Sequence, residues 1–252
     1  MGAAAESGSR DIAELRDSRV LALVLVCTVS FMNVLDITVV SVALGDIGQS
    51  LGASQSELQW VVDAYTLPLG ALLMSAATLS GSLGRLRLFR WGLVLFTVGS
   101  AVCALAPSML VLNAFRALQA VGGAIFLGVG VPMISDRYAA GRERARATGI
   151  YGLISGVAIA VGPLAGGGLV LVAGWRSIFW INVPVGVVSW LASWYVKDHG
   201  ADRRGSDVDW PGTLLAVLAT GGVTVVLLEG SAWGWTSART LGGVAVGLAA
   251  MG

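Results

Sequence analysis

Three ionisable residues stand inside otherwise apolar stretches of this sequence and are the residues best suited to do chemistry. They are Asp36, Asp63 and Arg116. An ionisable group in lipid is costly, so it normally faces a bundle interior or a cavity and serves a function. Because the arginine can pair with one of the two carboxylates, the other acid would be able to exchange a proton. The residue types therefore predict a proton-linked cluster. The simpler alternative is a buried ion pair that only stabilises helix packing.

Polar residues at helical spacing extend this set. They stand three or four positions from the charged residues and are expected to line a polar cavity: Asn33, Gln59, Thr66, Asn113 and Gln119. Helical rise places the three charged residues at similar depth, in the outer half of the membrane. No cluster of His, Cys or Glu stands at ligand spacing, so the sequence predicts no metal, no cofactor and no enzymatic activity.

Long stretches almost free of charge must position these residues. Seven of them cover residues 20–44, 58–83, 88–106, 109–135, 147–172, 178–196 and 211–228. An eighth begins at Leu241. About 20 apolar residues in a helix cross a bilayer core, and the backbone polar groups of such a segment must be satisfied within it. The sequence therefore predicts an all-α polytopic membrane protein.

The basic residues orient the chain and divide it. Most Lys and Arg residues occupy alternate gaps between the stretches: Arg10, Arg16, Arg19, Arg85, Arg87, Arg90, Arg137, Arg142, Arg144, Arg146, Lys197, Arg203 and Arg204. Because basic loops stay on the cytoplasmic side, the N-terminus is predicted to be cytoplasmic. The predicted organisation is a cytoplasmic tail at 1–19, a six-helix bundle at 20–196, a cytoplasmic linker at 197–210, and a seventh helix with a short eighth at 211–252.

The fifth stretch combines several glycines with a central proline. The positions concerned are Gly149, Gly162, Pro163, Gly166 and Gly167. Proline removes a backbone hydrogen bond and kinks a helix, and glycine lets a neighbouring helix approach the backbone. Close packing alone is the simpler reading of this pattern.

Together these motifs resemble the major facilitator superfamily, specifically its drug:proton antiporter branch with 14 helices. The resemblance covers about residues 20–240. It is carried by Leu35-Asp36-Ile-Thr38, by Gln59-Trp60-Val-Val-Asp63, by Arg116 with Gln119 and Gly122, and by the glycine–proline pattern of the fifth stretch. The resemblance implies the N-terminal six-helix bundle of such a transporter, a link between Arg116 and proton coupling, and tight packing of the fifth helix.

The loop between the second and third stretches departs from that family. Gly81, Arg85 and Arg87 preserve a glycine and the basic charge. The Asp and the second Gly of the family pattern are absent from the loop. The resemblance implies that acidic and basic residues of this loop hold the cytoplasmic ends of the helices together. The basic residues of this sequence are therefore expected to lack their acidic partner.

The implied function is proton-coupled export (antiport) of hydrophobic small molecules such as drugs or antibiotics across the plasma membrane. The expected partners are the small hydrophobic substrate, protons and the lipid bilayer, without nucleic acid. The alternative is a truncated, transport-incompetent half-transporter that acts only as a membrane-embedded fragment, because the stretch from Leu241 reaches only Gly252. A retinal-type photoreceptor would need a Lys within a helix, and Lys197 stands at a helix end.

Overall fold

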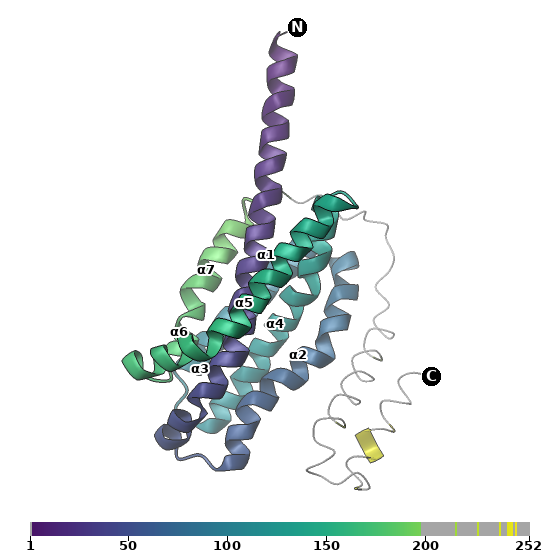
Figure 1. The fold of residues 1–252 in the computed structure, drawn as a ribbon. Helices are drawn as coiled ribbons and strands as arrows, with labels where there is room; N and C mark the ends of the chain where they lie inside the picture. The colour runs from purple at the N-terminus through teal and green to yellow at the C-terminus, as the bar shows by residue number, and fades with distance from the viewer. Residues whose placement is uncertain are drawn as a thin grey trace.

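The computed structural model describes residues 2–197, together with positions 215, 226, 237, 241–243 and 245. The side chains described within the first range begin at Ser18. The helices are α1 (Gly2–Leu51), α2 (Gln55–Leu83), α3 (Arg85–Ala104), α4 (Met109–Arg137), α5 (Arg142–Ala173), α6 (Ser177–Trp180) and α7 (Asn182–Ser193). They form a single bundle in which α1 extends beyond the other helices at its N-terminal end (Figure 1).

The predicted fold class is confirmed. Five helical segments of the described chain are long and apolar enough to cross a membrane. They are the part of α1 from Ser18 onward and the helices α2, α3, α4 and α5. The predicted sixth crossing, 178–196, consists of α6 and α7, which meet at Ile181 and end at Ser193. Each long helix extends beyond its predicted apolar stretch at one end or both, because helix termini continue into the polar residues that flank the hydrocarbon core. At its C-terminal end α3 stops at Ala104, two positions before the predicted end of that stretch. The predicted linker at 197–210 and the helices at 211–252 lie outside the described residues, apart from Lys197 and the isolated positions.

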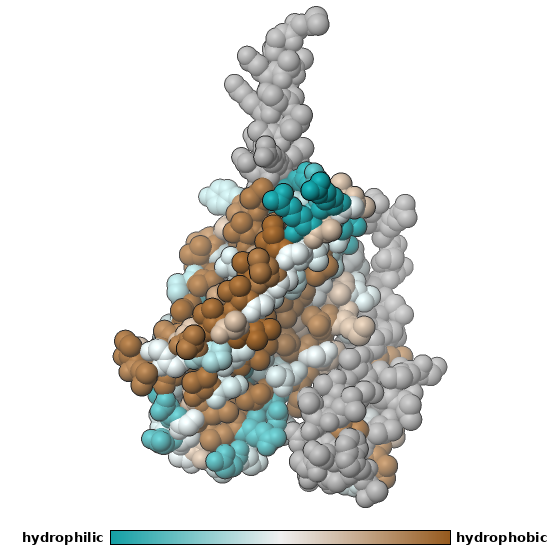
Figure 2. All heavy atoms as spheres, viewed as in Figure 1, coloured by the Kyte–Doolittle hydropathy of each residue, from teal (hydrophilic) through white to brown (hydrophobic). Residues whose placement is uncertain are grey.

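Short turns connect the long helices and force neighbours in sequence to run antiparallel. Gly84 alone separates α2 from α3, with a φ of 89° that an L side chain rarely adopts. The connection between α1 and α2 ends in a capping box, in which Ser54 accepts from the backbone N–H of Glu57 and the Glu57 carboxylate accepts from that of Ser54. These turns bring charged and polar residues to the two ends of the bundle (Figure 2).

The bundle is organised around α4. This helix packs most extensively against α2 and α3, while α1 packs against α5. Two apolar clusters fill the interior. One contains Met32, Phe96 and Phe126, and the other contains Leu35, Cys103 and Leu112. The exposed surface is apolar along much of α1 and α5, as expected for helices in lipid or against another apolar surface (Figure 2).

At Gly162 the backbone of α5 packs directly against the Thr38 side chain of α1. A Cβ built on Gly162 would lie 1.9 Å from the hydroxyl oxygen of Thr38 and 2.6 Å from its Cβ. Thr38 cannot turn away freely, because its hydroxyl donates to the carbonyl of Leu35 at 2.9 Å in its own helix. Only glycine fits at this crossing.

We therefore expect Gly162→Ala to destabilise the chain by about 1–3 kcal/mol, the usual cost of overpacking a tight core. Thermal unfolding of the purified protein in detergent measures this change. Gly167→Ala is the matched control, because nothing lies within 4 Å of its added Cβ. Alanine favours helix over glycine, so the control should be neutral or slightly stabilising. Equal melting of the two variants would contradict the close crossing.

Candidate functional site

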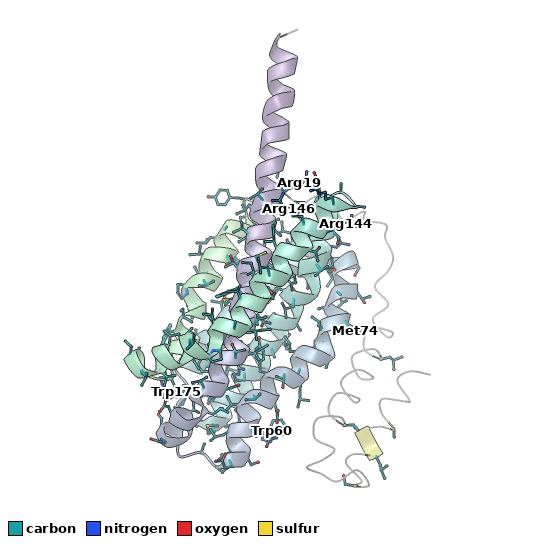
Figure 3. All side chains as sticks on the ribbon, in the orientation of Figure 1. Arg19, Trp60, Met74, Arg144, Arg146 and Trp175 are labelled. Atoms are coloured by element: carbon teal, nitrogen blue, oxygen red, sulfur yellow. The ribbon has the colours of Figure 1, made fainter. Side chains whose placement is uncertain are left out.

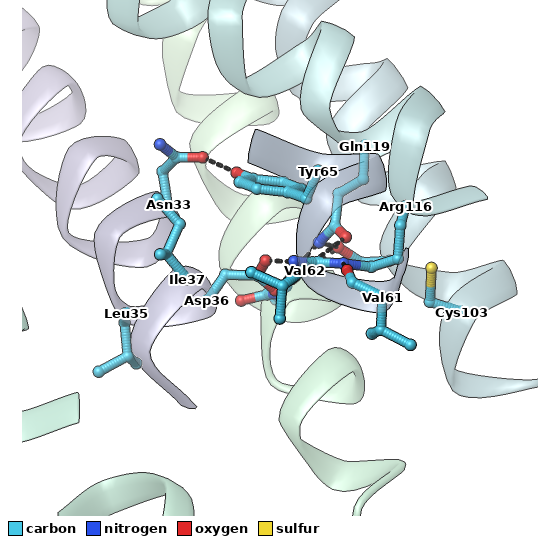
Figure 4. Close-up of polar contacts among 12 residues, drawn as sticks. Asn33, Leu35, Asp36, Ile37, Val61, Val62, Tyr65, Cys103, Arg116 and Gln119 are labelled. Atoms are coloured by element: carbon cyan, nitrogen blue, oxygen red, sulfur yellow. Dashed lines mark hydrogen bonds and ion pairs between the residues drawn. The ribbon is translucent and has the colours of Figure 1, made fainter. Parts of the chain in front are cut away.

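An ion pair between Asp36 of α1 and Arg116 of α4 lies at the centre of the bundle. Nη1 of Arg116 donates to Oδ2 of Asp36 at 2.5 Å. Asp36 is 3% exposed and Arg116 is 1% exposed, so both are withdrawn from solvent and lipid. A charge this deeply buried is tolerated only when it is paired and hydrogen-bonded. The surrounding groups meet that requirement (Figure 4).

Two amides from different helices complete the coordination of the Asp36 carboxylate. Its Oδ1 accepts from Nε2 of Gln119 at 3.1 Å and from Nδ2 of Asn182 at 2.8 Å. Nε2 of Gln119 also donates to the hydroxyl of Ser100 at 2.8 Å. The carboxylate therefore joins α1, α3, α4 and α7 in one buried network. We call Asp36, Ser100, Arg116, Gln119 and Asn182 the central network.

Arg116 has acceptors besides the carboxylate. Its Nε donates to the backbone carbonyl of Val61 at 3.1 Å, and its Nη1 donates to Oε1 of Gln119 at 2.8 Å. The guanidinium lies 4.1 Å from the centroid of the Tyr65 ring and 5.7 Å from that of Phe179, within cation–π range. Its positive charge is thus partly compensated even without Asp36.

The central network separates the two apolar clusters of the interior. Along α1, Met32 belongs to one cluster and Leu35 to the other. Along α4, Ala120 belongs to the first and Leu112 to the second, with Arg116 between them. The ion pair therefore has apolar packing on both sides along the bundle axis, which shields it from water at either end.

Asp63 occupies a different environment from Asp36. It is half-buried on α2, between Val61 and Tyr65 in sequence. The backbone carbonyl of Val61 and the ring of Tyr65 both contact Arg116. Within the described chain, the hydrogen bonds and ion pair of Arg116 go to Asp36, Gln119 and Val61. The structure thus brings Asp36 and Arg116 into contact and places Asp63 beside them on the neighbouring helix.

The predicted cavity-lining residues fall into buried and exposed groups. Asn33 is fully buried and accepts from the Tyr65 hydroxyl through Oδ1, while its Nδ2 has no hydrogen-bond partner within the described part of the chain. Gln119 belongs to the central network. Thr66 is half-buried and donates to the carbonyl of Val62. Gln59 is exposed near the N-terminal end of α2, and Nδ2 of Asn113 lies 3.5 Å from the carbonyl of Glu57.

The glycine–proline positions of α5 face two ways. Gly162 and Gly166 are buried against Thr38 and Val39 of α1. Gly149 and Pro163 are exposed, and Gly167 is half-buried with nothing within 4 Å of its Cβ position. This face of α5 is thus uncovered by the described residues, and the helix continues through Pro163 to Ala173.

The three residues predicted to lie in a cytoplasmic loop belong to helices instead: Gly81 lies in the last turn of α2, and Arg85 and Arg87 lie in the first turn of α3, because Gly84 alone separates the two helices. Arg85 obtains an acidic partner from another helix. Arg85 forms an ion pair with Asp136 at the end of α4 and donates to the carbonyl of Pro132 at 2.9 Å. Gly81 and Arg87 are exposed. The acid missing from the loop is therefore replaced, for Arg85, by a carboxylate 51 positions away in sequence. Nearby, Tyr138 donates to the carbonyl of Arg19 at 3.2 Å, and burial raises the pKa of its phenol.

Sequence reasoning did not select Ser100, Asn182 or Tyr65. Ser100 and Asn182 are small neutral residues in apolar stretches, where they carry no charge to mark them. Tyr65 stands two positions after Asp63 but resembles any core aromatic. Their buried polar atoms are informative only once their partners are known. The one usable signal was an amide side chain, Asn182, inside the predicted apolar stretch 178–196.

The fold and the site define a class: a multi-pass helical membrane protein built around a buried arginine–carboxylate pair. The sequence from residue 26 to residue 252 matches the family model described as Major Facilitator Superfamily, and the chain belongs to this superfamily. This membership confirms the resemblance and places the chain among membrane transport proteins rather than enzymes.

Characterised relatives share substantial identity with the chain. Multidrug resistance protein Stp of Mycobacterium tuberculosis is 40% identical over 84% of this chain and 39% of its own length. Methylenomycin A resistance protein of Streptomyces coelicolor is 35% identical over 87% of this chain and 46% of its own length. Cephamycin export protein CmcT of Amycolatopsis lactamdurans is 37% identical over 91% of this chain and 48% of its own length. The chain thus spans less than half the length of these relatives.

Solved structures share the fold at lower identity. A bacterial homolog of the human lysosomal transporter Spinster, in an inward-facing and unoccupied conformation, superposes with a TM-score of 0.60 at 20% identity. The match covers 93% of this chain and 60% of the Spinster homolog. A peptide transporter of the POT type gives a TM-score of 0.56 at 15% identity, over 87% of this chain and 48% of its own.

Proposed function

We propose that this chain supplies one helical bundle of a proton-coupled exporter of small hydrophobic molecules, such as drugs or antibiotics. The observation that carries the proposal is the Asp36–Arg116 pair, which holds an ionisable carboxylate in a fully buried position of a transport protein. The names of the relatives support the substrate class, since they describe multidrug resistance, methylenomycin A resistance and cephamycin export.

The central network gives a physical route for a proton to change the bundle. Protonation of Asp36 would remove the charge that holds Arg116, and hydrogen bonds to a charged group are worth about 1.5–3 kcal/mol each. Arg116 would keep Gln119, Val61 and the two aromatic rings as partners, so its charge would stay compensated. Because the carboxylate accepts from groups on α4 and α7, its neutralisation weakens contacts among three helices together.

Asp63 is the second carboxylate of the proposed coupling site. Its half-buried position on α2 gives it better access to a proton than Asp36 has. The polar residues Gln59 and Thr66 lie on the same helix and would line the path to it. In this scheme substrate and proton compete for one polar region, and export follows when the inward proton gradient displaces the substrate.

The test is a transport assay on the complete gene product in everted membrane vesicles. Addition of a transported drug to vesicles with an acidic interior should release protons and partly dissipate the imposed pH gradient. Drug accumulation should stop when an ionophore collapses that gradient. Drug accumulation that persists unchanged without a gradient would overturn proton coupling while leaving export itself intact.

The proposed location is the cell membrane with a cytoplasmic N-terminus. In support, Arg19, Arg144 and Arg146 lie at one end of the bundle, and Trp60 and Trp175 lie at the other (Figure 3). Arginine-rich ends remain on the cytoplasmic side of the membrane, and tryptophans concentrate at membrane interfaces.

We expect single cysteines at the two ends to label from opposite sides. Pro107→Cys lies in the exposed turn between α3 and α4, and Ala140→Cys lies in the exposed turn between α4 and α5. A membrane-impermeant maleimide should label Pro107→Cys in intact cells and Ala140→Cys only after permeabilisation. The native Cys27 and Cys103 are buried and provide a low background. The reverse labelling pattern would refute the proposed orientation.

A further inference from the structure

A groove between α3 and α7 opens at the arginine-rich end of the bundle, away from the central network. Its volume is about 430 Å³. The lining combines two arginines with three tryptophans and a valine: Arg87, Arg90, Trp91, Val94, Trp190 and Trp194. An arginine side chain is permanently protonated, so Arg87 and Arg90 bring positive charge to the groove.

The arginine on the groove wall is held in a defined position. Nε of Arg90 donates to the hydroxyl of Ser193 at 3.0 Å, and its Nη2 donates to the backbone carbonyl of Ser193 at 2.8 Å. Its guanidinium stacks over the Trp194 ring at 4.0 Å, and Trp190 meets Trp194 edge to face. Arg87, three positions earlier on α3, is exposed. The groove thus presents two permanent cations on one helix face.

The surface that continues from the groove toward the middle of the bundle is apolar. Trp91 is 61% exposed, and Val98, two turns further along α3, is 48% exposed. On α7, Leu191 and Val188 continue from Trp194 and are also exposed. In a membrane-spanning bundle such a surface contacts acyl chains, and tryptophans mark the level of the headgroups. Charge at that level and apolar surface beneath it match an amphipathic anion.

We propose that this groove binds an anionic phospholipid, with its phosphate beside Arg87 and Arg90 and its acyl chains along Val94, Val98 and Leu191. Guanidinium groups match the geometry of phosphate oxygens, and basic residues at a membrane surface attract anionic lipid. The three tryptophans provide a rigid amphipathic frame around the headgroup. This site is independent of substrate and proton coupling.

Fluorescence quenching by brominated lipid tests the site directly, because three groove residues are tryptophans. The purified 252-residue chain is reconstituted in phosphatidylcholine bilayers that contain a minor fraction of brominated phosphatidylglycerol or, in parallel, brominated phosphatidylcholine. The difference between the two isolates selective binding from general contact with lipid. We expect the anionic lipid to quench more strongly at equal fraction, and Trp91→Phe to remove part of this extra quenching.

Charge variants locate the effect. Arg87→Gln should lower the preference for the anionic lipid by roughly fivefold, the effect of one basic residue near the membrane surface. Arg142→Gln, which removes an exposed arginine from the first turn of α5, should leave the preference unchanged. Equal quenching by both lipids would overturn the proposal, as would an equal loss in the two variants. Reversal of the quenching by inorganic phosphate alone would show a site for a free anion and not for a lipid.

Discussion

Replacement of Arg116 by Met is expected to destabilise the bundle by about 3–5 kcal/mol, the largest stability effect of any single change considered. The loss comes from Asp36, which would remain 3% exposed with a negative charge and no cation beside it. The amides of Gln119 and Asn182 still donate to the carboxylate, but they do not supply the compensating charge. Thermal or denaturant unfolding of the purified chain in detergent measures the effect.

A double-mutant cycle separates the charge from the packing. In the Asp36→Asn, Arg116→Met double variant no buried charge remains, so we expect at least half of the lost stability to return. Arg142→Met controls for the loss of an arginine side chain, because Arg142 is exposed on the same chain. If the two substitutions simply add, the pair contributes by packing and not through its charge.

Replacement of Asp36 by Asn is expected to abolish the pH dependence of export while leaving the protein in the membrane. Coupling between two ligands of about 1–3 kcal/mol corresponds to a 5–150-fold change in affinity, so the parent protein should lose at least about fivefold in drug affinity when the site is protonated. An asparagine cannot ionise, and it can still accept from Gln119 and Asn182. Drug binding and efflux measured across a pH series would show a flattened profile.

Asp63→Asn tests whether the second carboxylate also takes part in coupling. We expect it also to weaken the pH dependence, because Asp63 is the half-buried acid next to the Arg116 contacts on α2. Gln55→Ala, an exposed polar change at the start of the same helix and outside the proposed path, serves as the control for surface effects on α2. If both acid variants export with an unchanged pH profile, the central network stabilises packing only.

Much of the architecture follows from local features of the sequence. Apolar length and the scarcity of charge mark the membrane-spanning helices, because an unsatisfied backbone cannot exist in lipid. The same scarcity singles out Asp36, Asp63 and Arg116, since a charge inside a membrane-spanning segment is costly and normally serves a function. Gly162 and Pro163 could likewise be recognised as a close-packing pattern. These signals depend on one helix at a time.

Tertiary structure alone decided which groups meet. From the sequence, Asp36 and Asp63 were equivalent partners for Arg116, because both stand at similar depth. The relative rotation of the helices places Asp36 against the guanidinium, and that rotation depends on crossings such as the one between Gly162 and Thr38. The third ligand of Asp36, Asn182, is 146 positions away, and Asp136 reaches Arg85 from a different helix. Hydropathy and charge determine how deep a residue lies, but only packed side chains determine which way it faces.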